Sequence, residues 1–534
     1  MGLIETVLDH VSFTSVFIVL SIAYALWTIY LKIDENARLR RLGLRGPRIK
    51  SNWPWGLEII KKQVFATITH TCYEVYLELV GHLPNYTGES NLLGFRVVLT
   101  ADPENIKAIL ATQFPEFGKG EQFHKEWSEF LGDSIFTTDG HQWHVSRQLL
   151  RPQFSRERIS DLHCFESHLE TFFKAVANGG VLNGEEQKVD IEAGNGKPFD
   201  ICDLFYRYTL DVATDFLLGL DIQSLTKPDE PFAEAFKHVQ SVQNVIARAG
   251  TLQPLVPKKT FRQGLKVINE LCNIYIDRAL QLSPEELASK TKADQGYTFL
   301  HELASFTRDR KVLRDQVVAV LLAGRDTTAA TLSFAFYELG RHPEVVRKMR
   351  QEIISQVGLE RTPTYTDLKN MKYLQNVINE TLRLYPAVPY NVRTALKDTT
   401  LPRGGGPDGS LPLPVLKGTA VGYSTLVMQR RPDLYPAGAN PDAFDPERWF
   451  TWQPKPWYYI PFNGGPRICI GQQFALAEIG YVLTRIFQRF ERVESFMHEI
   501  DGGKPKLNSE VVIKPEDGVR VALWEARREK EGLM

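Results

Sequence analysis

The sequence feature that most constrains this chain is a ten-residue loop at residues 462–471, which reads Phe-Asn-Gly-Gly-Pro-Arg-Ile-Cys-Ile-Gly. An amphipathic run at residues 472–490 follows it. Cys469 therefore lies where the chain enters a helix, whose free backbone N–H groups favour a thiolate and lower its pKa. Gly465 and Gly471 carry no side chain, so the backbone can approach a flat cofactor closely.

The chemistry of this loop indicates a cysteine thiolate bound to haem iron. Arg467 can pair with a cofactor carboxylate, and Phe462 can shield the sulfur of Cys469 from water. The alternative is a buried structural cysteine, because a free cysteine usually behaves as a small hydrophobe. The loop resembles the haem-binding loop of the cytochrome P-450 superfamily, F-x-x-G-x-R-x-C-x-G, at every fixed position. This resemblance implies haem b with Cys469 as the axial iron ligand.

The composition excludes several other classes of protein. The chain has 534 residues, with 63 Lys+Arg against 64 Asp+Glu, and this balance gives no indication of a nucleic-acid partner. Its five cysteines are scattered and show no zinc-type spacing. They favour a reducing compartment with free thiols over a disulfide scaffold.

The N-terminal segment predicts a membrane anchor. No charged residue occurs from Val11 to Leu31, and as a helix this run would be about 30 Å long, which matches a bilayer core. The alternative is a cleaved signal peptide, which usually has a positive start and a shorter apolar core. Acidic residues precede this run and basic residues follow it, so the positive-inside rule places the rest of the chain in the cytosol.

The expected organisation follows from these features. We expect a single-pass anchor in the endoplasmic reticulum membrane at residues 1–31, a basic Pro/Gly linker at residues 32–55 and a cytosolic catalytic domain at residues 56–534.

A second motif pairs Trp143 with Arg147, four residues apart on one face of a predicted helix. By itself, this pair is also typical of a core tryptophan beside a surface arginine. In the P-450 family the corresponding side chains reach a haem propionate. The resemblance implies the same role for Trp143 and Arg147, and makes Arg393 a further propionate partner.

The third motif, Ala-Gly-Arg-Asp-Thr-Thr at residues 323–328, lies in a long apolar helix predicted over about residues 315–340. Glycine inside a helix costs about 1 kcal/mol relative to alanine, so stability alone does not explain Gly324. We interpret Gly324 as opening a groove beside the iron, and Asp326 and Thr327 as catalytic residues that deliver protons to dioxygen. The alternative is a buried helix with a local kink. Similarity to the family's A-G-x-D-T-T pattern favours the proton relay.

The fourth motif is Glu380 with Arg383, three residues apart on a helix that Pro386 ends. Such a pair is usually an exposed ion pair of little energetic value. The resemblance instead implies a buried structural triad of Glu380, Arg383 and Arg448 that supports the haem loop.

The four motifs occur in the family's order, and the resemblance extends from about residue 56 to the end of the chain. It implies a mainly α fold with small β-sheets, in which haem lies between the long helix and the cysteine loop. Among the other segments, residues 94–100 have strand character, and residues 401–417 and 511–523 each predict a hairpin.

The implied activity is monooxygenation, because a thiolate ligand favours O–O cleavage. The sequence has no nicotinamide or flavin domain, so we expect an NADPH–haemoprotein reductase as electron donor, with cytochrome b5 as a second candidate. Residues 323–328, 380–386, 399–406 and 462–467 are most similar to fungal P-450 families that hydroxylate n-alkanes and fatty acids at the chain end.

Other functions remain open at this point. The uncharged wall at residues 317–322 suits an alkyl chain, and equally the polyketide or terpenoid substrate of a secondary-metabolite monooxygenase. A third alternative is a haem-binding membrane protein without turnover, or an isomerase. The presence of Asp326 and Thr327 argues against this third alternative.

Overall fold

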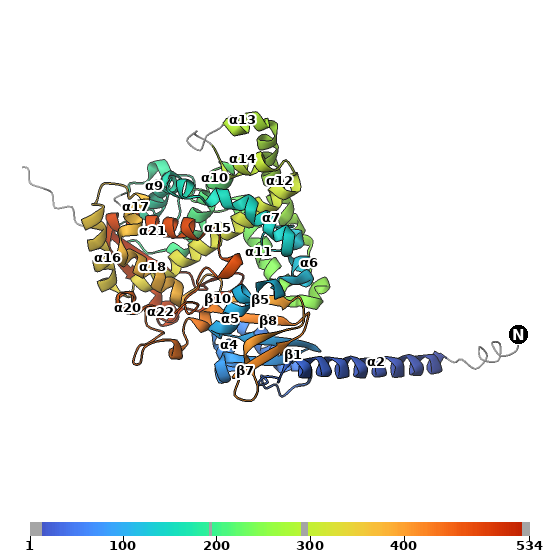
Figure 1. Ribbon diagram of the computed structural model, residues 1–534. Coiled ribbons are helices and arrows are strands. Elements are labelled where there is room, and N and C mark those ends of the chain that lie inside the picture. The colour runs from blue at the N-terminus through green and yellow to red at the C-terminus, as the bar shows by residue number, and fades with distance from the viewer. Residues whose placement is uncertain (1–12, 192–194, 290–296, 526–534) are drawn as a thin grey trace, which may run out of the picture.

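The computed structural model describes residues 13–191, 195–289 and 297–525 (Figure 1). Helices form most of the body, and the largest β-sheet lies on the side from which helix α2 (Phe13–Leu42) extends. This architecture confirms the predicted mainly α fold with small sheets.

The central element is helix α15 (Arg310–Leu339), most of whose side chains are buried. Asp309 caps its start, where the carboxylate accepts hydrogen bonds from the backbone N–H groups of Lys311 at 2.8 Å and Val312 at 3.3 Å. The helix is assigned continuously through Gly324. Side chains of α15 belong to both of the largest apolar clusters of the core.

The other helices surround α15. Those before it are α3 (Leu57–Thr69), α4 (Cys72–Val80), α5 (Pro103–Lys107), α6 (Gly120–Leu131), α7 (Gly140–Leu150), α8 (Arg156–Ile159), α9 (His163–Ala177), α10 (Ile201–Leu218), α11 (Pro231–Ala249), α12 (Lys259–Gln281), α13 (Pro284–Ser289) and α14 (Phe299–Phe306). Those after it are α16 (Pro343–Gln356), α17 (Tyr365–Asn370), α18 (Lys372–Leu384), α19 (Thr425–Met428), α20 (Arg448–Thr451), α21 (Gln472–Arg489) and α22 (Met497–Asp501).

The largest sheet has the strand order β1-β2-β8-β5-β3. Strands β2 and β8 are parallel, and the other neighbours are antiparallel. Its strands are β1 (Thr87–Leu92), β2 (Phe95–Thr100), β3 (Phe117–Gly118), β5 (Tyr390–Ala395) and β8 (Ala420–Ser424). The sheet positions Arg393, which lies on β5 opposite Val421 of β8.

The smaller sheets confirm one predicted hairpin and correct the other. Strands β6 (Thr399–Gly405) and β7 (Leu411–Val415) form the first. In the tail, β11 (Ile513–Pro515) pairs with β10 (Leu507–Ser509), whereas β12 (Arg520–Glu525) pairs with β9 (Phe490–Ser495) and β4 (Phe199–Asp200). The predicted second hairpin is therefore wrong, because each strand finds its partner upstream in the chain.

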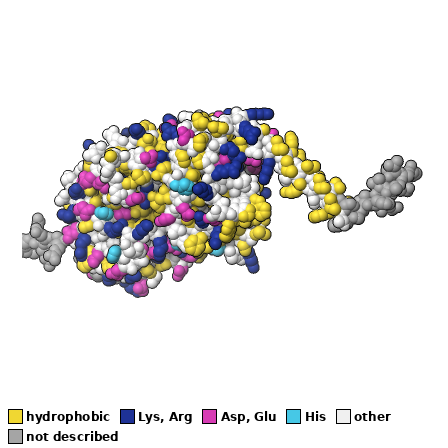
Figure 2. All heavy atoms as spheres, turned by 90° about the horizontal axis from the view of Figure 1, so that it is seen from below, with side chains coloured by type: hydrophobic (Ala, Val, Ile, Leu, Met, Phe, Trp, Pro, Cys, Tyr) yellow, Lys and Arg dark blue, Asp and Glu magenta, His cyan; other side chains and the backbone are white. Residues whose placement is uncertain are grey.

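Helix α2 projects away from the body (Figure 1), and its apolar side chains cover its surface (Figure 2). Two helices of the described part are long and apolar enough to cross a membrane, Val16–Leu42 and Arg310–Leu339. The first is exposed, whereas the second is the buried core helix α15. Near its end, α2 contacts the body: Leu39 is buried and Arg38 donates to Asp398 at 2.9 Å. Residues 1–12 of the expected anchor lie outside the described residues.

Candidate active site

A cavity of about 870 Å³ lies between the middle of α15 and the loop that precedes α21. Most of the predicted site residues line it: Trp143, Arg147, Gly324, Thr327, Arg393, Phe462, Arg467, Cys469 and Gly471. Asp326, Gly465, Glu380, Arg383 and Arg448 are not among its lining residues. The structure thus brings together side chains from α7, α15, β5 and the loop at residues 462–471.

The loop holds Cys469 against this cavity. The backbone N–H of Cys469 donates to the carbonyl of Phe462 at 3.0 Å, which closes the loop. Gly465 adopts φ +66°, and a Cβ there would lie 1.9 Å from the carbonyl oxygen of Leu110, so only glycine fits. At Gly471 an added Cβ would meet only Phe154, at 3.5 Å, which is an ordinary contact. Close packing within the described protein thus requires glycine at residue 465 but not at 471.

The pKa of the Cys469 thiol corrects an expectation from the sequence. Cys469 is exposed to the cavity, yet desolvation by the surrounding protein raises this pKa above its usual range, although the N–H of Gly471 and the charge of Arg147 lower it. The entry into α21 therefore does not by itself hold a thiolate. Coordination to a metal ion deprotonates a thiol outright, so an iron bound to Cys469 would supply the stabilisation that the surrounding protein lacks.

Four basic side chains converge on one end of the cavity: Lys119, Arg147, Arg393 and Arg467. Burial and the nearby charge of Arg393 lower the pKa of Arg467 to about 10. Burial, together with Arg393 and Arg467, lowers the pKa of Lys119 well below its usual range. These cations repel one another, which indicates that the site lacks negative charge.

The anionic partner in this cluster is Asp139, whose Oδ1 accepts from Arg467 Nη2 at 2.6 Å. Arg147 donates to the backbone carbonyl of Ile468 at 3.0 Å, and Arg393 donates to the side-chain carbonyl of Asn391 at 2.8 Å. Both acceptors are neutral. The buried Nε of Arg467 has no hydrogen-bond partner among the residues that the structure describes. The two propionates of a haem would supply the missing charge and acceptors, so the residues present fit this cofactor.

Trp143 forms the wall beside the cluster. It is buried and packs against Phe114, with ring centroids 5.3 Å apart. The guanidinium of Arg467 lies 4.7 Å from its ring centroid, a cation–π contact. Trp143 therefore orients Arg467.

Helix α15 lines the cavity with Gly324 and Thr327. A Cβ at Gly324 would meet only Ala213, at 3.9 Å, so the glycine leaves open space beside the cavity. The Thr327 hydroxyl donates to the carbonyl of Ala323 at 2.7 Å. Asp326 faces elsewhere: it is buried, accepts a hydrogen bond from Gln240 of α11 and lies 3.4 Å from Arg325. Consecutive helical residues point in directions about 100° apart, which separates Asp326 from Thr327.

Glu380, Arg383 and Arg448 form a buried cluster. Glu380 accepts from Arg383 at 2.8 Å and from Arg448 Nε at 2.9 Å. Trp449 Nε1 and the backbone N–H of Asp445 add further bonds to the same carboxylate, at 3.0 and 2.9 Å. Both carboxylate oxygens of Glu380 therefore accept hydrogen bonds. Glu380 and Arg383 lie inside the protein, although ion pairs with i,i+3 spacing are usually found on helix surfaces.

Comparison with known proteins identifies this arrangement. A family model described as cytochrome P450 matches residues 88–520. The chain belongs to the cytochrome P450 family. It is 50% identical to "Cytochrome P450 monooxygenase pvhE" of Talaromyces variabilis over 99% of both chains. It is 42% identical to "Cytochrome P450 52A13" of Debaryomyces hansenii, with 81% of this chain and 82% of that protein covered.

The crystal structure of the cytochrome P450DA haem domain shares the fold of this P450, with a TM-score of 0.70 and 21% identity over 91% of this chain and 98% of the other. As a member of this family, the protein uses haem with a cysteine thiolate ligand as its cofactor, and its activity is monooxygenation. In this family a reductase supplies electrons from NADPH.

Two residues of this site were missed by the sequence analysis. Lys119 follows a short strand and carries no motif, so nothing local distinguishes it. Glu478 is buried on α21 and lines the cavity. Burial raises its pKa to about 8, against a hydrogen bond from Thr328 that lowers it. A lone acid in the otherwise uncharged run at residues 475–484 was the signal that could have revealed Glu478.

Proposed function

We propose that this P450 hydroxylates the chain end of a long-chain apolar substrate, a fatty acid or an n-alkane, with electrons from an NADPH-dependent reductase at the endoplasmic reticulum membrane. The observation that carries this proposal is the composition of the cavity. Its walls are mostly apolar, and a cation lies at its rim. The resemblance of four sequence segments to alkane and fatty-acid hydroxylases supports the same substrate class.

The walls come from elements on all sides of the cavity. They include the apolar side chains of Phe123, Trp127, Leu131, Phe216, Leu217, Val320, Leu322, Val388, Val392 and Val512. Burying an apolar chain against such walls contributes about 0.8 kcal/mol per CH₂ group. A chain of ten or so methylene groups therefore gains enough to bind without polar contacts.

Arg248 favours a fatty acid over an alkane. It lines the cavity from α11, and its side chain is exposed to solvent. Its guanidinium donates to Thr67 of α3 and to the carbonyl of Ser509 of β10, which fixes its position. A carboxylate at Arg248 would form a charge-assisted hydrogen bond, and the alkyl chain would extend inward from it.

Within the cavity, the protein's own residues would position the reaction. When bound, the haem supplies the electron-rich iron that activates dioxygen. Lys119, Arg147, Arg393 and Arg467 would bind its propionates. The Thr327 hydroxyl would hold and transfer a proton in the groove that Gly324 leaves open.

Glu478 provides a second proton source. Since its pKa is about 8, its carboxyl carries a proton at neutral pH and can donate it. Asp326 would act indirectly, because Gln240 and Arg325 hold its carboxylate outside the cavity.

Exposed apolar side chains support attachment to a membrane. They continue from α2 onto the neighbouring body as Trp55, Val64, Phe65, Ile68, Phe95 and Leu255, each more than half exposed, and yellow side chains gather on this side in Figure 2. A membrane surface would cover these side chains.

A spectral titration tests the substrate class. Lauric acid and dodecane should each shift the haem from low to high spin. Arg248→Gln should weaken lauric acid binding roughly tenfold, the value of one charge-assisted bond, and leave dodecane unchanged. Lys237→Gln, an exposed residue of the same helix, is the matched control. No shift with either compound, beside a shift with a bulky ring compound, would favour the secondary-metabolite alternative.

A further inference from the structure

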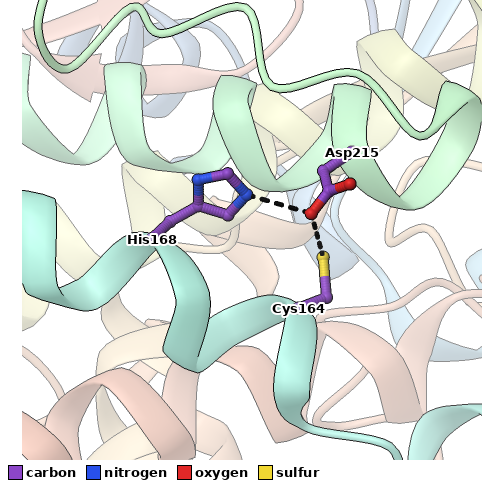
Figure 3. A group of neighbouring side chains, drawn as sticks. All are labelled: Cys164, His168 and Asp215. Carbon is purple, nitrogen blue, oxygen red and sulfur yellow. Dashed lines mark hydrogen bonds and ion pairs between the residues drawn. The ribbon is translucent and has the colours of Figure 1, made fainter. Parts of the chain in front are cut away.

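A second group of metal-binding side chains lies away from the haem cavity, between α9 and α10. Cys164 and His168 are one turn apart on α9, and Asp215 faces them from α10 (Figure 3). Their ligand atoms all lie within 4.8 Å of one another. None of the three lines the haem cavity, and the catalytic proposal does not use them.

The two distances from Asp215 to the other ligand atoms match edges of a zinc coordination tetrahedron. Asp215 Oδ2 lies 3.2 Å from His168 Nε2 and 3.7 Å from Cys164 Sγ, and Figure 3 shows both interactions meeting at this one oxygen. Zinc ligands lie about 2.0 Å (N, O) and 2.3 Å (S) from the ion. Tetrahedral angles then separate O from N by roughly 3.3 Å and O from S by roughly 3.5 Å.

Further carboxylates lie behind His168, on the side away from Asp215. The other ring nitrogen of His168, Nδ1, lies 4.0 Å from Asp221 Oδ1, and Asp211 completes this second group of ligand-type atoms. Asp211 is itself fixed, because it accepts from the backbone N–H groups of Ser224 at 2.8 Å and Leu225 at 3.0 Å. At 4.0 Å the Asp221 carboxylate is too far for a hydrogen bond to Nδ1, but its negative charge favours a cation at this group.

The site is open on one side. His168 is buried, whereas the side chain of Asp215 is 36% exposed. Solvent can therefore reach the group and complete a four-coordinate shell with one water molecule. Cys, His and Asp together form the donor set that Zn²⁺ prefers among common cytosolic cations.

We propose that Cys164 Sγ, His168 Nε2 and the Asp215 carboxylate bind one Zn²⁺ ion, which clamps α9 to α10. Binding displaces the thiol proton of Cys164 to solvent, so the ligand is the thiolate. Since α10 packs along α15, the ion would fasten the outer helix α9 to the layer that supports the haem cavity.

Zinc stoichiometry of the full-length haem protein tests this proposal. The protein is dialysed with micromolar Zn²⁺ and then against metal-free buffer, and zinc is counted per haem by mass spectrometry. We expect one retained zinc in the wild type, and at least a tenfold weaker affinity in Cys164→Ser and Asp215→Asn. His163→Gln, an exposed neighbour on α9, should retain the ion. Unchanged zinc binding in both site variants, or none in the wild type, would overturn the proposal.

X-ray absorption at the zinc edge keeps the test decisive if a variant fails to fold. The wild type should show one sulfur at about 2.3 Å and lighter ligands at about 2.0 Å. A shell of nitrogen and oxygen alone would mean adventitious binding at surface groups and would contradict the site.

Discussion

The carboxylate of Glu380 accepts two hydrogen bonds from the guanidinium of Arg383, both at 2.8 Å, and neither side chain is exposed to solvent. Arg383 also donates to Tyr435 at 3.0 Å and to the carbonyls of Pro441 and Ala443 at 2.5 and 3.0 Å. This guanidinium therefore fastens α18 to the segment that leads to the cysteine loop. Lysine, with a single nitrogen, cannot reproduce that set of bonds.

We therefore predict that Arg383→Lys loses most of the haem-containing protein. Breaking a buried pair costs about 3–5 kcal/mol, which is a large part of the stability of a typical domain. The measurement is the amount of haem per purified chain. Glu185→Gln is the control, because its partner Lys188 has the same i,i+3 spacing at 2.9 Å on an exposed surface. Equal haem content in the two variants would refute a structural role for the triad.

A change at Thr327 should separate proton delivery from haem binding. We predict that Thr327→Ala retains its haem spectrum but diverts reducing equivalents to hydrogen peroxide, because it lacks the hydroxyl that faces the cavity. The readout is peroxide formed per NADPH oxidised with the reductase present. Ser333→Ala removes an equivalent hydroxyl, which bonds the carbonyl of Ala329 at 2.7 Å and does not line the cavity. If both variants remain as coupled as the wild type, Thr327 is not part of the relay.

Local patterns predicted the elements that carry chemistry, because the relevant residues lie close together in the sequence. The Cys469 loop, the Gly324 segment and the pair Glu380 and Arg383 are each contained within ten residues. Long-range geometry was not accessible in this way. The pairing of β11 and β12 depends on strands elsewhere in the chain, and the orientation of Asp326 depends on its contact with Gln240 of α11.

Two features that the sequence analysis missed, Lys119 and the group of Cys164, His168 and Asp215, have the same explanation. Lys119 joins the cationic cluster only because α6 begins beside β5, a contact between distant segments. Cys164 and His168 form a candidate metal site only together with Asp215, which lies about fifty residues later in the sequence and is brought beside them by the packing of α9 against α10. Sequence proximity reveals motifs, whereas tertiary packing determines which isolated side chains join them.

Lys119 should contribute to haem retention. We predict that Lys119→Gln loses haem to an acceptor such as apomyoglobin roughly ten- to a hundredfold faster, because one charged bond to a propionate contributes about 1.5–3 kcal/mol. Lys125→Gln, an exposed lysine on α6, should match the wild type. Identical rates for all three proteins would remove Lys119 from the propionate site.

The buried carboxyl of Glu478 predicts a pH dependence of stability. Its folded-state pKa, about 8, is raised from 4.5 by burial. Between these values the folded chain holds a proton that the unfolded chain has released, so this group makes stability fall as pH rises. At about 1.4 kcal/mol per tenfold change in proton affinity, the effect at pH 8 is on the order of a few kcal/mol.

Glu478→Gln should remove this contribution. We expect the urea midpoint of the wild type to fall more between pH 6 and pH 8 than that of the variant, since every other titrating group is common to both proteins. Parallel pH profiles would show that Glu478 does not carry a proton in the folded state.

The central claim is the bond between the Cys469 sulfur and the haem iron, and the spectrum of the reduced, carbon-monoxide-bound protein tests it directly. The wild type should show the red-shifted Soret band of thiolate ligation, and Cys469→Ala should lose that band. Cys272→Ala, a change at a buried thiol that does not line the cavity, should keep it. Folded wild-type protein without haem, or a red-shifted band that persists in Cys469→Ala, would contradict the account.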